Sequence, residues 1–174
     1  MEEIRIAYPA SFRRDVSGRI TVRFADLPEA LTDGATEEEA LDEAVDCLSE
    51  ALMSRIADGD VVPAPRPAGR GHRLIAPDPT VALKVALYAI VRARRISAAQ
   101  LARQLRIDPK EARRLLDPRH PSKAPRLFEA LHALGCNAAV TLFDRSPNKR
   151  ILSVAGTTKS QRADLKDRFK IKAA

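Results

Sequence analysis

Aromatic residues are scarce in this 174-residue chain: they make up 4% of it, and tryptophan is absent. Neither a stacking platform for single-stranded nucleic acid nor a large aromatic ligand pocket is readily built from this composition, and no cofactor is predicted. The longest apolar runs, such as residues 85–91, fall far short of the ~20 residues needed to cross a bilayer. We therefore expect a protein without a membrane span.

Cysteine is equally rare. Cys47 and Cys136 form no CxxC motif, and no secretory signal stands at the N-terminus, so we expect a protein of the reducing cytoplasm. The three histidines, at positions 72, 120 and 132, match neither HExxH nor HxxxH spacing. No metal site is predicted.

Charged residues are abundant and unevenly distributed. Residues 1–62 contain 15 acidic and 6 basic side chains, a net charge of −9, whereas residues 63–174 contain 24 basic and 8 acidic ones, a net charge of +16. A strongly basic segment favours phosphate-rich partners, and an acidic segment favours a basic partner. The sequence therefore predicts two interaction surfaces of opposite charge.

The acidic half begins with a predicted β-hairpin. Residues 4–12 and 19–24 are strand-like, with apolar and polar side chains alternating in the second stretch, and residues 15–18 form the turn between them. Residues 60–71 are rich in Pro and Gly and are expected to be irregular, and residues 72–76 supply a third strand.

A long amphipathic helix should pack on this hairpin. Thr36 and Glu39 have the spacing of a helix N-cap, and Gly59 is expected to end the helix. The apolar stripe between them follows a three- and four-residue spacing: Leu41, Ala44, Val45, Leu48, Ala51, Leu52 and Ile56. The prediction is a small α+β domain over residues 1–77, with an antiparallel sheet and a packed helix.

The many carboxylates of this half do not predict catalysis. A metal-dependent or acid–base site would require several of them to turn inward together. Instead, they fall in the hairpin turn, in the first helical turn and on the polar side of the helix: Asp15, Glu37, Glu38, Glu39, Asp42, Glu43 and Asp46. Solvation explains these positions, so we predict no catalytic residues and no enzyme activity.

The basic half is predicted to be helical. After a helix over residues 78–95, Ser97 is placed to cap a short helix, and Asp108 with Pro109 begins another. This arrangement resembles the helix-turn-helix pattern. Counted from Ala98, the small residue of the fifth place and the apolar residues of the fourth, eighth, tenth, fifteenth and eighteenth places are Ala102, Leu101, Leu105, Ile107, Ala112 and Leu115.

Arg106 departs from that pattern. It occupies the ninth place, which is commonly Gly because the bend favours a left-handed backbone. The alternative is a helical hairpin inside a bundle, which Ala- and Leu-rich sequences can also form.

If the motif binds DNA, its second helix and the following loop present the contacts. Lys and Arg there can neutralise phosphates, and Arg can bind the O6 and N7 edge of guanine. The predicted DNA-binding residues are Gln100, Pro109, Lys110, Arg113, Arg114, Arg119 and Lys123. Solvation is the competing interpretation for each charge, and Arg114 has the further alternative of pairing with Glu111 or Asp117.

The rest of the chain is expected to contain a helix over residues 125–135 and a short strand over 137–143. The predicted helix-turn-helix domain thus spans residues 78–143. For the basic tail, residues 144–174, two interpretations stay open: a disordered arm, or a segment that follows DNA phosphates.

Four segments in this order resemble the HicB-type antitoxins of HicA/HicB toxin–antitoxin systems, in the branch with a C-terminal, Cro/XRE-like helix-turn-helix domain. They are FADLPEALTDGATEEEALDEA at 24–44, DGDVVPAP at 58–65, LKVALYAIV at 83–91, and RRLLDPRHPSK at 113–123 followed by LFEALHALG. The resemblance covers roughly residues 4–143. Ala25, Glu29 and Ala30 depart from the family pattern, and the tail lies outside it.

The resemblance implies a reduced ribonuclease H-like N-terminal domain that lacks catalysis and holds a small basic toxin, HicA, which cleaves messenger RNA. It also implies a homodimer or higher even oligomer that binds operator DNA and represses its own operon. On the segment that matches, the expected toxin-facing carboxylates are Asp26, Glu29, Asp33 and Glu37. Two alternatives stay open: a stand-alone transcription regulator, and a ribonuclease H-like nuclease with a DNA-binding domain.

Overall fold

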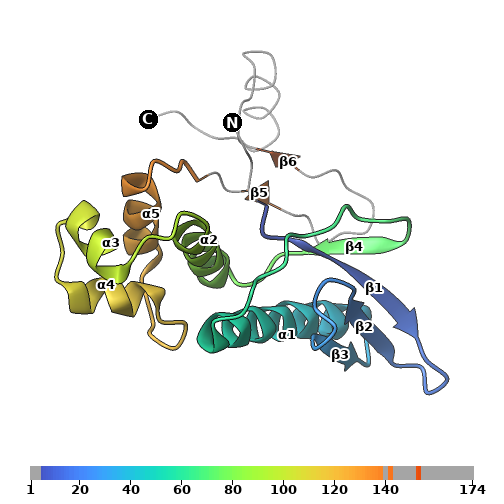
Figure 1. The fold of residues 1–174 in the computed structure, drawn as a ribbon. Coiled ribbons are helices and arrows are strands. Elements are labelled where there is room, and N and C mark those ends of the chain that lie inside the picture. Colours follow the sequence, from blue (N-terminus) through green and yellow to red (C-terminus); the bar gives the residue numbers. More distant parts are fainter. Residues whose placement is uncertain (1–4, 139–140, 143–151, 154–174) are drawn as a thin grey trace, which may run out of the picture. The chain divides into compact units, whose positions relative to one another are not determined.

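The computed structural model describes residues 5–138, 141–142 and 152–153, and the chain divides into two compact units, Met1–Gly135 and Cys136–Ala174. The first unit contains, in chain order, β1 (Tyr8–Arg14), β2 (Ile20–Phe24), β3 (Leu31–Gly34), α1 (Glu37–Asp58), β4 (His72–Ile75), α2 (Pro79–Ala93), α3 (Ala98–Leu105), α4 (Pro109–Leu116) and α5 (Ala124–Ala133) (Figure 1). This order confirms the predicted α+β part followed by helices.

In the second unit, β5 (Thr141–Leu142) pairs antiparallel with β6 (Leu152–Ser153). The strand predicted at residues 137–143 is thus observed at Thr141–Leu142. Apart from β6, the predicted tail at 144–174 lies outside the described residues.

The four-stranded sheet of the first unit is antiparallel throughout, with the strand order β3-β2-β1-β4. The β1–β2 turn forms as predicted. Asp15 Oδ1 accepts hydrogen bonds from Ser17 N (2.9 Å) and Arg19 N (3.0 Å), and Gly18 adopts a φ of 87°. The edge strand β3 was not predicted, because its sequence Leu-Thr-Asp-Gly is too short and too polar to resemble a strand.

Helix α1 begins and ends at the predicted residues. Thr36 Oγ1 accepts a hydrogen bond from Glu39 N (3.1 Å), which satisfies a free amide of the first turn, and Glu39 Oε2 accepts one from Ala35 N (2.7 Å), just before the N-cap. At the other end, Gly59 adopts the left-handed conformation with φ 73°.

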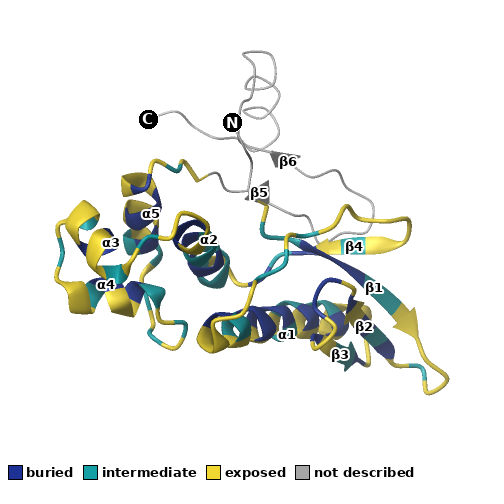
Figure 2. Cartoon of the chain, viewed as in Figure 1, coloured by how far each residue is buried: buried dark blue, intermediate teal, exposed yellow. Residues whose placement is uncertain are grey.

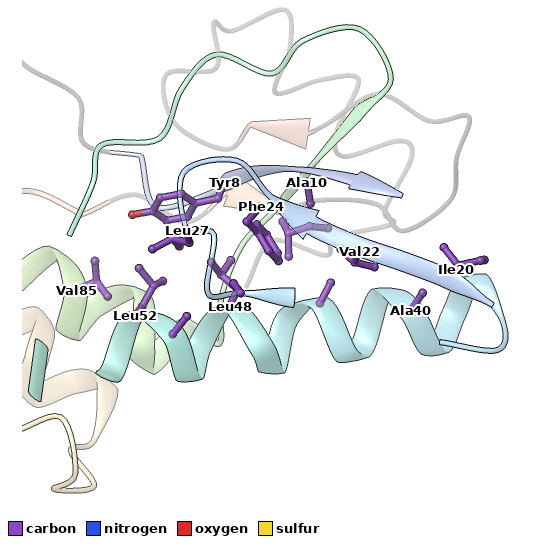
Figure 3. Close-up of a cluster of buried hydrophobic side chains, with 14 of the residues drawn as sticks. Tyr8, Ala10, Ile20, Val22, Phe24, Leu27, Ala40, Leu48, Leu52 and Val85 are labelled. Atoms are coloured by element: carbon purple, nitrogen blue, oxygen red, sulfur yellow. The ribbon is translucent and has the colours of Figure 1, made fainter. Parts of the chain in front are cut away.

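One face of the sheet and the apolar stripe of α1 form the core (Figure 3). Val22, Leu48 and Leu52 are fully buried there, and Figure 2 shows the buried residues of α1 on the side toward the sheet. Of the predicted stripe, Leu41 and Val45 are partly buried and pack against this core. Burial of these side chains accounts for the position of α1 on the sheet.

The Pro-rich segment after α1 has no regular secondary structure, as predicted, but hydrogen bonds from three elements hold it in place. Tyr8 Oη donates to Pro63 O (2.8 Å), Arg55 Nη1 to Val61 O (3.0 Å) and Tyr88 Oη to Asp60 O (3.0 Å). The segment is therefore attached to β1, α1 and α2.

Tyr8 makes the stability pH-dependent at high pH. Burial, with a smaller effect of the Asp26 carboxylate, raises its pKa from 10.0 to about 12. Because the folded pKa is raised, the stabilisation from Tyr8 is fully present below pH 10 and is lost as the pH rises to 12, by about 2 to 3 kcal/mol. Tyr8→Phe should be less stable at pH 7 by about 1 to 3 kcal/mol, since Pro63 O loses its donor.

The difference in unfolding free energy between the two proteins, measured in urea at several pH values, should then shrink above pH 10. Parallel stability profiles would contradict the predicted role of the Tyr8 hydroxyl.

Helix α2 packs against the sheet part as well as against the helices that follow it. Val85 is fully buried in the same core as the sheet residues, and Arg92 Nη1 donates to Gly59 O at the end of α1. Asp78 caps α2 as predicted, since its Oδ1 accepts from Thr80 N (2.8 Å). The hydrophobic core of the sheet part thus includes a residue of α2, beyond residue 77, where the sequence suggested a domain boundary.

Arg106 adopts the left-handed conformation, with φ 54° and ψ 45°. The bend between α3 and α4 therefore has the backbone geometry that usually selects Gly. For an arginine, this left-handed conformation costs about 1 to 2 kcal/mol of conformational free energy. Arg106→Gly should raise the free energy of unfolding by about 0.5 to 1 kcal/mol, after the larger entropy loss of Gly on folding is subtracted. Thermal or urea unfolding measures the change.

Arg103→Gly is the matched control, because Arg103 is an exposed arginine inside α3. It should lower the stability by about 1 kcal/mol. A loss of stability in both variants would show that the bend gains nothing from Gly.

Candidate functional site

Helices α3 and α4 form a compact pair joined by Arg106–Asp108. Leu101, Ala102, Ala112 and Leu115 are buried at the crossing, while Leu105 and Ile107 are partly buried. The fully buried alanines allow close approach of the two helices. These are the six residues that the sequence predicted for the corner.

Both helices begin at capped N-termini. Ser97 Oγ accepts from Gln100 N (3.2 Å), and Gln100 Oε1 accepts from Ser97 N (2.7 Å), which completes a capping box. Asp108 Oδ1 accepts from Lys110 N (2.7 Å), with Pro109 in the first turn of α4. Because the Gln100 oxygen is engaged in the cap, only its amide N–H groups remain for a phosphate.

The outer face of α4 is basic. Lys110, Arg113 and Arg114 are exposed, and their three- and four-residue spacing places them on one side of the helix. Among the described residues, none of the three forms an ion pair. Their charges are therefore free to meet an anionic partner.

Glu111 does not pair with Arg114, which was one alternative left open by the sequence. Instead, Glu111 Oε1 accepts from Arg126 Nη2 (2.6 Å) and Nε (3.0 Å), and Arg126 also binds Glu129 (2.6 Å) on α5. These bonds connect α4 to α5 and hold the one acidic side chain of α4 beside a cation.

The loop between α4 and α5 carries two further predicted cations, Arg119 and Lys123, both exposed. The Asp117 carboxylate accepts from Arg119 N (2.9 Å), so it supports the loop backbone, and no ion pair joins it to Arg114 within the described part of the chain. The predicted basic residues of α4 and its loop thus lie on consecutive, exposed segments.

Three further cations of the helical part were not predicted from the sequence. Arg103 and Arg106 are exposed and form no ion pair with any described residue. They lie in α3 and in the bend, whereas the predicted DNA contacts lie mainly on the second helix and its loop. The third, Lys84, is buried within an otherwise apolar stretch, where only its tertiary contacts reveal a role.

The four carboxylates expected to face a toxin are each paired with an arginine of the sheet part. The pairs are Asp26–Arg66, Glu29–Arg55, Asp33–Arg19 and Glu37–Arg73. Three of these carboxylate side chains are about half exposed, and the Arg55 guanidinium lowers the pKa of Glu29.

Asp26 differs from the other three. Its side chain is only 3% exposed and accepts from the backbone N of Arg66 (3.1 Å) as well as from its guanidinium. The structure places Asp26 as an anchor of the Pro-rich segment, where its carboxylate is not open to a partner.

These carboxylates also do not gather at one place. Arg55, which binds Glu29, lies five turns along α1 from Glu37, about 27 Å at 1.5 Å per residue. A second acidic surface lies on the solvent side of α1, where Glu43, Asp46 and Glu50 are exposed at helical spacing and form no ion pair among the described residues. We call these three residues the α1 acidic stripe.

No group of three or more His, Cys, Asp or Glu side chains is arranged to hold a metal ion in the described parts of the chain. Four acidic side chains of the sheet part form ion pairs with arginines, Asp15 accepts hydrogen bonds within the β1–β2 turn, and the α1 acidic stripe is spread along its helix. Of the described helices, none has the length and apolar character to span a membrane.

These observations define a small α+β protein with an acidic helix face on its sheet part and a basic helix face in the helices that follow. Residues 7–86 match the family model described as the HicB-like antitoxin of bacterial toxin–antitoxin systems, and the chain belongs to this family. Antitoxin HicB 2 of Photorhabdus laumondii is 38% identical over 128 residues, which cover 74% of this chain and 90% of the relative.

Two further relatives have names from the same family. Antitoxin HicB of Escherichia coli K12 is 33% identical over 128 residues, 74% of this chain and 93% of the relative. Antitoxin HicB of Pseudomonas fluorescens is 32% identical over 119 residues, 68% of this chain and 82% of the relative.

Proposed function

We propose that this antitoxin has two macromolecular partners. Its acidic sheet part, predicted as residues 1–77, binds and neutralises a small basic toxin of the HicA type that cleaves messenger RNA. Its helical part, predicted as residues 78–143, binds operator DNA and represses its own operon. The observation that carries the proposal is the unpaired basic face of α4 in the same chain as the acidic surface of α1.

The toxin side follows from electrostatic complementarity. A protein that holds RNA for cleavage needs a positive surface, and an acidic surface of matching size can cover it. The α1 acidic stripe offers unpaired carboxylates for this contact. Glu29, Asp33 and Glu37 are about half exposed and can exchange their arginine partners for cations of a toxin.

The DNA side follows from the α3–α4 pair. In a helix-turn-helix, the second helix enters the major groove, and its exposed side chains read base edges. Here that helix is α4, with Lys110 and Arg113 as the leading base-reading residues, and Arg114, Arg119 and Lys123 as phosphate contacts. Gln100 stands at the start of α3, where its side-chain amide N–H groups can anchor a phosphate. Pro109 stands at the start of α4 and, lacking a backbone N–H, can contact DNA only through its ring. A homodimer would place two such helices about 34 Å apart, one turn of DNA.

Co-expression of this chain with whatever reading frames adjoin its gene tests the toxin side. We expect a small basic protein to co-purify with the chain, to cleave RNA when it is isolated, and to lose that activity when the chain is added back. If no such protein co-purifies while DNA binding is retained, the chain is instead a stand-alone transcription regulator.

The nuclease alternative has its own test. Purified chain should leave labelled RNA intact across a Mg²⁺ titration, because no catalytic carboxylate site is predicted. Mg²⁺-dependent cleavage that disappears on substitution of this chain's own carboxylates would establish the nuclease and refute the binding-protein proposal.

A further inference from the structure

Lys84 is a buried cation in an apolar environment. It is 6% exposed and lies between Leu83 and Val85 on α2. A lysine here costs desolvation free energy that a methionine or leucine of similar volume would avoid. Burial lowers the pKa of its ammonium group, and the nearby Asp117 carboxylate opposes that shift.

The ammonium group binds backbone rather than a carboxylate. Lys84 Nζ donates to Asp117 O (2.5 Å) and to His120 O, the two carbonyls that frame the start of the α4–α5 loop. Asp117 is the C-cap of α4, where the last carbonyls of a helix are unsatisfied and carry partial negative charge. The buried ammonium group therefore fixes the backbone at the C-terminal end of α4.

The loop that Lys84 holds carries exposed cations on its outer side. Arg119 lies between the two bound carbonyls in sequence, and Lys123 follows three residues after the second one. Internal bonds of the loop run from Arg119 N to the Asp117 carboxylate and from His120 N to Asp117 O (3.3 Å). Within the described residues, no ion pair fixes either exposed cation. Their positions thus depend on the loop backbone.

We propose that Lys84 is a positioning residue for DNA binding, which holds the α4–α5 loop so that Arg119 and Lys123 meet phosphates while α4 lies in the groove. This inference rests on the proposed operator binding. Lys84 itself contacts no DNA, since its ammonium group is inside the protein. Its role is to keep two phosphate contacts in register with the base-reading face of α4.

The test is the salt dependence of binding to a duplex from the region upstream of this chain's coding sequence. Each phosphate contact contributes about 0.9 to the slope of log K against log salt concentration. Lys84→Met, which keeps the volume and removes the charge, should lower the magnitude of that slope by about 1 to 2. The double variant Arg119→Ala/Lys123→Ala should lower it by the same amount.

Combining Lys84→Met with that double variant should produce no further change, because all three substitutions act on the same contacts. Arg92→Gln is the matched control: Arg92 is also a cation of α2, but it binds Gly59 O at the end of α1, so the slope should remain that of the unmodified protein. A purely structural role of Lys84 would lower the melting temperature and leave the slope unchanged.

Circular dichroism at the assay temperature establishes that each variant is folded. If Lys84→Met does not fold, Lys84→Gln retains a neutral donor for one carbonyl and should give a slope between those of the unmodified protein and Arg119→Ala/Lys123→Ala. An unchanged slope, or an additive effect with Arg119→Ala/Lys123→Ala, overturns the role of Lys84 and leaves operator binding intact. Absence of binding by the unmodified protein overturns both proposals.

Discussion

Arg113→Ala is expected to weaken binding to the specific operator by about 1 to 3 kcal/mol, a loss of roughly 5- to 150-fold in affinity. Arg113 is exposed on α4, forms no ion pair among the described residues, and can donate two hydrogen bonds to one guanine. Loss of a base contact lowers affinity for the operator more than for unrelated DNA. Titration of a fluorescent operator duplex and of a scrambled duplex of equal length measures both affinities.

Arg119→Ala is the matched comparison within the same surface. Because Arg119 lies in the loop after α4, its replacement should weaken binding to both duplexes similarly. It should also lower the magnitude of the slope of log K against log salt concentration by about 1. If Arg113→Ala leaves the preference for operator DNA unchanged, Arg113 is not a base-reading residue, and the proposed orientation of α4 in the groove is wrong.

Gly34→Ala is expected to lower the free energy of unfolding by about 3 kcal/mol or more. Gly34 is the last residue of β3, and its φ is not positive, so the requirement for Gly is steric. A Cβ atom there would lie 2.7 Å from Ala40 Cα and 2.9 Å from the Glu39 carbonyl carbon, and closer still to Ala40 N. These are backbone atoms of the first turn of α1 and cannot move aside as a side chain can. Urea unfolding measures the loss.

Gly18→Ala is the control for this prediction. Gly18 has a φ of 87° but no atom within 4 Å of an added Cβ, so its substitution should cost only the conformational strain, about 1 to 2 kcal/mol. Equal losses in the two variants would mean that β3 moves away from α1 at little cost and that the close contact is not structurally required.

Local signals were sufficient to predict most of the secondary structure. The Thr36 cap, the Gly59 stop and the apolar stripe between them delimit α1 within the chain, since each acts over three or four residues. Ser97 and Asp108 do the same for α3 and α4. Strand β3 was missed because its identity comes from pairing with β2, a contact that no local pattern of four residues specifies.

The candidate site was predictable in part, and for a similar reason. The exposure of Lys110, Arg113 and Arg114 follows from the periodicity of α4 alone. Whether an acidic side chain is buried and paired or open to a partner does not follow from such a pattern. Asp26 is buried and paired with Arg66, 40 residues away in the chain, so composition could not distinguish an anchoring carboxylate from an open one.

The sequence by itself determined the helix limits, the segregation of charge and the membership in the HicB-like antitoxin family, because these depend on local spacing and residue type. Only the tertiary structure decided which charges are free. Asp26 and Lys84 are held by partners that are distant in sequence, whereas the cations of α4 form no ion pair with any described residue. The physical reason is that burial and pairing of a charge depend on which segments meet in space.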